Sequence, residues 1–167
     1  VYWGNTTLQT TWEDPVFSTL PAEFDGMRVV QLSDLHSREF GPDNADLFQT
    51  VAQAEPDYIF LTGDLVDEHD SDPIPYARQV GEGLSAIAPV YFVTGNHEWA
   101  HGPAAVEALK TALRESGVTV LSNEFVPLER NGGTILLAGL DDPNGYADQT
   151  SPETVAARLY AAWGDPF

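Results

Sequence analysis

Short apolar runs alternate along this chain with longer segments in which apolar residues recur every three or four positions. The apolar runs are typical of buried strands, and the periodic segments are typical of amphipathic helices. Strands are predicted at residues 8–16, 27–32, 58–62, 90–94, 118–121, 125–128 and 134–140. Helices are predicted at residues 44–54, 76–87, 103–115 and 152–163. Because strands alternate with helices, we expect an α/β protein with a largely parallel, layered sheet.

Three short polar segments each come directly after one of these predicted strands. They are Ser33-Asp34-Leu35-His36, Gly63-Asp64-Leu65-Val66-Asp67 and Gly95-Asn96-His97-Glu98. The carboxyl ends of parallel strands meet at one edge of a sheet, and ligands of such sheets bind there. Carboxylate, amide oxygen and imidazole are the ligands that hard and borderline divalent metals prefer. The sequence therefore predicts a metal site at this edge.

Spacing within the segments supports this interpretation. Asp34 and His36 lie two positions apart, so an extended backbone would turn both side chains toward one metal ion and Leu35 away. Gly63 permits a tight turn just before Asp64. Taken singly, each acid has a structural alternative: Asp34 in a turn after a strand, Asp64 as a helix cap, or Asp67 as a solvated loop acid. The occurrence of all three segments in order favours the metal site.

The order D-x-H, then G-D-x-x-D, then G-N-H-[DE] resembles the calcineurin-like metallophosphoesterase superfamily over residues 27–143. The resemblance implies a layered β-sheet sandwich flanked by helices. It implies a metal-dependent phosphoester hydrolase that uses a dinuclear metal centre and metal-bound hydroxide on a phosphomonoester or phosphodiester. The two ions would be Mn, Fe or Zn. The implied ligands are Asp34, His36, Asp64, which would bridge the ions, and Asn96.

The same resemblance assigns catalytic roles to two further residues. His97 resembles the family's non-ligand histidine, which stabilises the pentacoordinate phosphorus or protonates the leaving oxygen. Asp67 resembles the aspartate that orients this histidine. Protein serine/threonine phosphatases of the family carry arginine directly after that aspartate, whereas this chain has Glu68. A protein-phosphatase assignment is therefore disfavoured.

One part of the family pattern is missing from this sequence. The family's second half supplies further histidine ligands, including a G-H-x-H segment, but no histidine follows His101 here. The chain, interpreted as a single domain over residues 1–167, thus resembles the N-terminal part of the family's domain. At most one metal ion is expected to bind this chain alone. The alternatives are a non-catalytic scaffold with the same fold and a truncated, inactive fragment.

Charge narrows the range of partners. The chain has 26 acidic against 7 basic residues, a formal net charge of −19, and a single lysine, Lys110. Such a surface repels nucleic acids and anionic lipids, so the expected partner is a small phosphoester. The scarcity of lysine favours adaptation to high salt, where counterions screen self-repulsion. The oligomeric state is not indicated.

Cysteine content and hydropathy add three exclusions. The chain has no cysteine, which excludes disulfides and thiolate metal sites. No apolar run approaches the ~18 residues that a membrane span needs. The first residues lack the basic and apolar regions of a signal peptide. A cytoplasmic or membrane-associated location is expected, with membrane anchoring only if residues upstream supply it.

Overall fold

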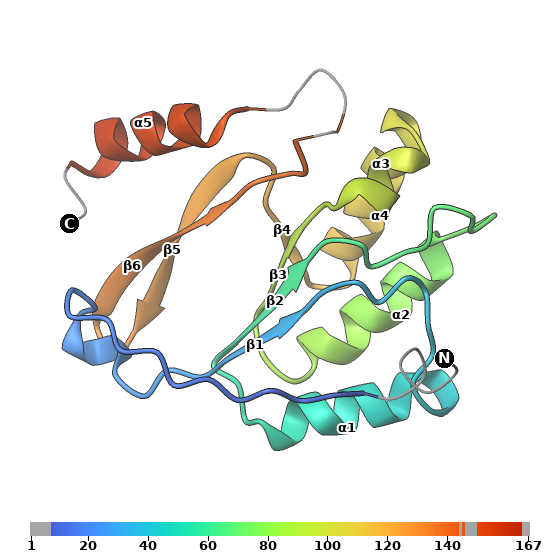
Figure 1. The fold of residues 1–167 in the computed structure, drawn as a ribbon, viewed down its shortest axis with the longest axis horizontal. Coiled ribbons are helices and arrows are strands. Elements are labelled where there is room, and N and C mark those ends of the chain that lie inside the picture. Colours follow the sequence, from blue (N-terminus) through green and yellow to red (C-terminus); the bar gives the residue numbers. More distant parts are fainter. Residues whose placement is uncertain (1–7, 144, 146–149, 165–167) are drawn as a thin grey trace.

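The computed structural model describes residues 8–143, 145 and 150–164. Its centre is a parallel four-stranded sheet in the order β1-β2-β3-β4 (Figure 1). The strands are β1 (Val29–Leu32), β2 (Tyr58–Thr62), β3 (Val90–Val93) and β4 (Thr119–Val120). Because all four strands run the same way, the segments that follow β1, β2 and β3 emerge at one edge, as predicted.

Helices cover one face of this sheet (Figure 1). They are α1 (Ala45–Gln53), α2 (Ile74–Ser85) and α4 (Pro103–Glu115), and short 3-10 turns occur at Ala22–Phe24 and Pro42–Asn44. Their apolar faces pack on the inward side chains of the strands, with Ile59, Val80, Phe92 and Leu113 all fully buried. This core stabilises the parallel sheet, whose strands need apolar cover.

A β-hairpin covers the other face. It consists of β5 (Glu124–Arg130) and β6 (Gly133–Gly139), followed by α5 (Pro152–Trp163) (Figure 1). Phe24, Tyr58 and Leu128 form a second buried cluster between the sheet and the hairpin. The molecule is thus layered as helices, parallel sheet and hairpin, and the α/β prediction is confirmed.

Two local predictions were wrong. Residues 8–16 form no strand, because they pair with no other strand and lie largely exposed, as Val16 shows. The last segment of the metal-site pattern lies in a short helix, α3 (Asn96–Ala100), where a loop was expected. The helix predicted at residues 152–163 is present as α5, but its apolar face is mostly exposed: Val155 is buried, whereas Tyr160 and Trp163 are 44% and 53% exposed. Periodicity alone does not reveal whether a partner surface exists.

Within the described residues, no helix combines the length and the apolar character needed to cross a membrane.

Candidate metal centre

The segments after β1 and β2 remain hydrogen-bonded beyond the regular strands. The amide of Asp34 donates to the carbonyl of Gly63 at 3.2 Å, and the amide of His36 donates to the carbonyl of Asp64 at 3.0 Å. Asp34, His36 and Asp64 have positive φ values of 58°, 48° and 52°, so the segment is not extended and that prediction was wrong. Two left-handed residues flank Leu35, which still points into the core, at 5% exposure.

This backbone brings three potential ligands together. Asp34, His36 and Asp64 each offer an oxygen or nitrogen, and these atoms all lie within 4.8 Å of one another. His36 Nε2 lies 3.7 Å from Asp34 Oδ1. His36 Nδ1 is buried, and no hydrogen-bond partner for it occurs among the described residues. Two carboxylates and an imidazole with an unsatisfied nitrogen fit a divalent ion such as Mn²⁺, Zn²⁺ or Fe²⁺.

Two glycines allow the second and third segments to touch. A Cβ atom on Gly63 would lie 2.6 Å from the amide nitrogen of Gly95, and one on Gly95 would lie 2.2 Å from Asp64 Oδ1. Gly63 also has a φ of +91°, a value that side chains disfavour. Both positions therefore require glycine for Asp64 to sit against the start of α3.

Helix α3 presents the predicted Asn96 and His97 to the same edge. The amide of His97 donates to Asp64 Oδ1 at 3.0 Å, so this carboxylate is fixed by the helix start. Asn96 is the first residue of α3 and is exposed. Its place beside Asp64 is compatible with the predicted ligation through its amide oxygen, which stays a prediction.

The ring of His97 is held by contacts that the sequence did not indicate. Its Nδ1 accepts the backbone N–H of Glu68 at 3.1 Å, and its ring meets that of His36 edge-on, with centroids 4.3 Å apart. Since Nδ1 accepts a hydrogen bond, the proton of the neutral imidazole must be on Nε2. His97 is thereby set up as a donor through Nε2.

Asp67 lies close to both histidines. A carboxylate oxygen of Asp67 and one nitrogen each of His36 and His97 fall within 4.8 Å of one another, a second set able to hold an ion. The pKa of Asp67 is lowered because its carboxylate accepts the amide of His69 and lies near the imidazoles of His69, His97 and His36. Asp67 is thus ionised beside His97. Its orienting role stays a prediction, since the contact that fixes the Nδ1 of His97 comes from Glu68.

Glu98 is a functional position that the motif contained but to which the sequence analysis gave no role. Its carboxylate is 1% exposed and accepts three backbone amides: Asp64 at 3.0 Å, Gly95 at 2.7 Å and Val66 at 3.1 Å. Burial raises the pKa of Glu98 despite these hydrogen bonds, and the nearby charge of Asp64 adds to the increase. Through these hydrogen bonds, the buried carboxylate of Glu98 links the second segment to the third.

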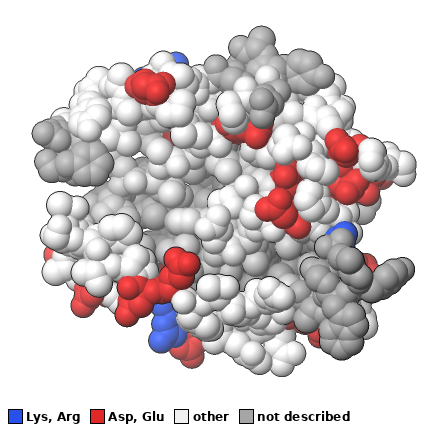
Figure 2. All heavy atoms as spheres, viewed as in Figure 1, with Lys and Arg blue, Asp and Glu red and all other residues white. Residues whose placement is uncertain are grey.

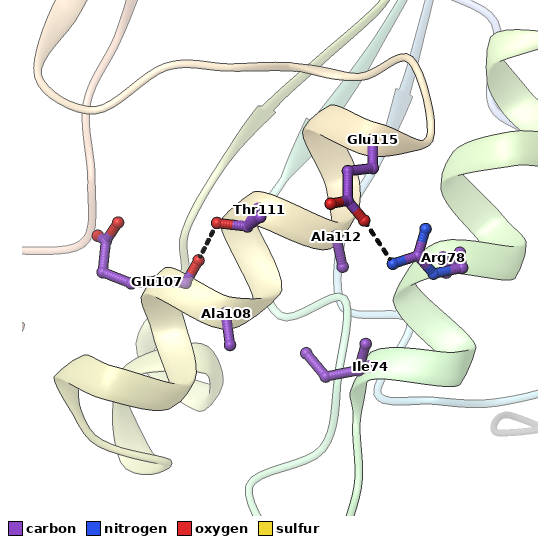
Figure 3. A pocket seen from close by; sticks show the side chains of 7 residues that line it. All are labelled: Ile74, Arg78, Glu107, Ala108, Thr111, Ala112 and Glu115. Atoms are coloured by element: carbon purple, nitrogen blue, oxygen red, sulfur yellow. Dashed lines mark hydrogen bonds and ion pairs between the residues drawn. The ribbon is translucent and has the colours of Figure 1, made fainter.

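The wider surface matches the composition. Figure 2 shows acidic side chains in several groups on one face and few basic ones. A groove of about 390 Å³ between α2 and α4 shares no residue with the metal cluster (Figure 3). An ion pair of 2.7 Å between Arg78 and Glu115 lines that groove. In the metal cluster itself, Asp34 is exposed and His36 and Asp64 are partly exposed.

Comparisons with known proteins agree with this arrangement. The statistical model of the family described as calcineurin-like phosphoesterase matches residues 27–165. An uncharacterized metallophosphoesterase of Bacillus subtilis, YkuE, is 29% identical over 143 residues, covering 81% of this chain and 48% of that protein. A Bos taurus protein named transmembrane protein with metallophosphoesterase domain is 34% identical over 141 residues, covering 80% of this chain and 31% of that protein.

Among solved structures, the phosphopantetheinyl hydrolase PptH from Mycobacterium tuberculosis has a similar fold. The TM-score is 0.52 at 19% sequence identity, covering 84% of this chain and 56% of that chain. The chain spans about half the length of YkuE and less of the bovine protein. Since the family model extends over most of the chain and includes every segment of the metal cluster, the chain belongs to the calcineurin-like phosphoesterase family.

Proposed function

We propose that this chain carries the metal-binding part of a hydrolase that acts on a small phosphomonoester or phosphodiester, together with a histidine that donates a hydrogen bond to the substrate. The observation that supports the proposal most strongly is the convergence of Asp34, His36 and Asp64 within 4.8 Å beside the ring of His97. Family membership supports the reaction class. The relatives named above do not define a substrate.

The donor set suggests how ions would be held. Asp34, His36 and Asp64 would hold one divalent ion, and Asp64 with Asn96 would contribute to a second. Bound ions would supply Lewis-acid activation of water and neutralise charge on phosphoryl oxygens. Two protein ligands hold an ion weakly, so we propose that this chain alone binds at most one ion well.

His97 and Asp67 would act on the phosphoryl group. His97 carries its proton on Nε2 because Nδ1 accepts the amide of Glu68. From that position the Nε2–H group would donate a hydrogen bond to a phosphoryl oxygen and so stabilise the pentacoordinate phosphorus, without transfer of the proton. The ionised carboxylate of Asp67, which lies near the ring, would help to orient His97.

Hydrolysis of p-nitrophenyl phosphate and bis(p-nitrophenyl) phosphate with added Mn²⁺ tests the proposal. We expect slow turnover that EDTA abolishes. His97→Ala and Asp67→Asn should each reduce turnover while keeping Mn²⁺ binding, and their losses should be less than additive because the residues act as a unit. Turnover unaffected by His97→Ala would contradict the assignment. Mn²⁺ binding with no turnover of either ester would favour a non-catalytic scaffold or an inactive fragment.

A further inference from the structure

A buried charged cluster lies behind the third segment of the metal centre. Lys110 on α4 is 2% exposed, and its Nζ lies 3.1 Å from Asp141 Oδ2. The same ammonium donates to Ser122 Oγ and lies 5.2 Å from the centroid of the Trp99 ring. The single lysine of the chain is therefore buried in an ion pair and does not contribute to the surface charge.

The other oxygen of Asp141 contacts the end of β3. Asp141 Oδ1 accepts the hydroxyl of Thr94 at 2.6 Å and its backbone amide at 3.4 Å. The next amide along the chain, that of Asp142, donates to the carbonyl of Thr94 at 3.1 Å. Thr94 is thus held on three sides by the loop that follows β6.

The hydroxyl of Thr94 continues the cluster into α3. It accepts the indole N–H of Trp99 at 2.9 Å while it donates to Asp141. Thr94 and Trp99 lie on either side of Gly95, Asn96, His97 and Glu98 in the sequence. The cluster therefore fixes both ends of the segment that carries Asn96 and His97.

A buried ion pair is a poor source of stability. The free energy needed to transfer two charges out of water is often as large as the gain from their mutual attraction. Apolar side chains of similar volume often stabilise a fold equally well. Here the pair adds something that apolar packing does not. Asp141 offers a hydrogen-bond acceptor aligned to Thr94, and Lys110 neutralises the charge of the Asp141 carboxylate. Contacts of this kind behind metal ligands set their orientation.

We propose that Lys110 and Asp141 are positioning residues for the metal centre, acting through Thr94 to hold Asn96 and His97 in place. With them they hold the ligand Asp64, whose carboxylate accepts the backbone amide of His97. The proposal rests on the proposed function, because a positioning role requires that the site binds metal. The contacts among Lys110, Asp141 and Thr94 do not depend on that function. It extends the functional set to α4 and to the loop after β6, which none of the three motif segments includes. The chemistry would be the orientation of ligand and donor groups rather than contact with substrate.

Two matched double variants separate positioning from stability. Lys110→Met with Asp141→Leu removes both charges and the acceptor for Thr94, whereas Lys110→Met with Asp141→Asn removes the charges but keeps an acceptor oxygen. The Asn variant should have a thermal midpoint near that of the wild type, whereas the Leu variant should have a lower one because the buried amide and hydroxyl of Thr94 lose their acceptor. Mn²⁺ affinity, measured by calorimetry, should fall about tenfold or more in the Leu variant and stay unchanged in the Asn variant.

A second pair covers the case in which the double variants fail to fold. Thr94→Val removes only the connecting hydroxyl, and Thr94→Ser keeps it. Thr94→Val should weaken Mn²⁺ binding, and Thr94→Ser should retain it. Leu113→Ala serves as the control. It creates a cavity one turn along α4 and should lower the thermal midpoint without touching the cluster.

Equal affinity in the Leu and Asn variants, or in Thr94→Val and Thr94→Ser, would overturn the proposal. So would a loss in Leu113→Ala as large as that in Thr94→Val. If the wild type binds no Mn²⁺, the proposed function fails, and NMR of the metal-free protein decides this inference instead. The amide signals of Asn96 and His97 should then shift in Thr94→Val and not in Thr94→Ser; unshifted signals would refute it.

Discussion

The buried carboxylate of Glu98 accepts the backbone amide of Asp64 at 3.0 Å, joining two segments that are 34 residues apart in sequence. The same carboxylate accepts the amides of Gly95 and Val66. Asp64 in turn accepts the amide of His97. Asp64 and the start of α3, which carries His97, are therefore fixed to each other before any ion binds, which reduces the cost of assembling the site.

Replacing Glu98 with glutamine tests this junction. The amide NH₂ of glutamine cannot accept a hydrogen bond, so at least one buried backbone N–H would lose its partner. We expect a loss of about 1–3 kcal/mol in the free energy of unfolding, measured with urea, together with weaker Mn²⁺ binding. Glu82→Gln, the same change on the exposed side of α2, should alter neither. Unchanged Mn²⁺ affinity in Glu98→Gln would refute the positioning role.

Glu98 should also affect how the free energy of unfolding depends on pH. Burial raises the pKa of Glu98 in the folded chain above its ordinary value of 4.5. Between pH 4.5 and the higher pKa of the folded state, Glu98 is therefore protonated in the folded chain and ionised in the unfolded chain. This contribution to stability is complete below pH 4.5 and is lost as the pH rises through the folded pKa.

The stability difference between wild type and Glu98→Gln isolates this titration. Urea unfolding of both proteins without metal should show the wild type losing stability relative to the variant as the pH rises from 4.5. A difference that is constant with pH, or that moves in the opposite direction, would show that the pKa of Glu98 is not raised.

Gly95→Ala should damage the metal centre by direct contact. The added Cβ would lie 2.2 Å from Asp64 Oδ1, so Asp64 must move. We expect Mn²⁺ affinity to fall at least about tenfold, as typically happens when residues supporting metal ligands are changed. Gly132→Ala is the matched control: it has open space but a φ of +87°, so it should cost stability alone. Equal Mn²⁺ affinity in the two variants would contradict the close approach of the two segments.

Salt should stabilise the chain. Its net charge of −19 produces self-repulsion in the compact state, and added ions screen it. The thermal midpoint should rise markedly between dilute buffer and molar KCl, measured by circular dichroism without metal. The same scan in molar sucrose separates screening from general exclusion effects. A flat or falling midpoint in KCl would count against adaptation to high salt.

Sequence patterns predicted the sheet, four of the helices and the edge where the site lies, because strand and helix periodicities reflect burial directly. They failed where partners decide the outcome: residues 8–16 look like a strand but have nothing to pair with. The left-handed turns at Asp34 and His36 were also missed, since no glycine marks them. The role of Glu98 was hidden because its partners are backbone amides, which no residue type reveals.

Calorimetric titration of the chain with Mn²⁺ tests the central claim, a divalent metal site formed by Asp34, His36 and Asp64. We predict one ion per chain in the wild type and no binding in Asp64→Ala. Asp14→Asn, an exposed acid far from the cluster in sequence, should bind as the wild type does. Absence of binding in the wild type, or binding that survives Asp64→Ala, would contradict the site. Two tightly bound ions would contradict the predicted stoichiometry.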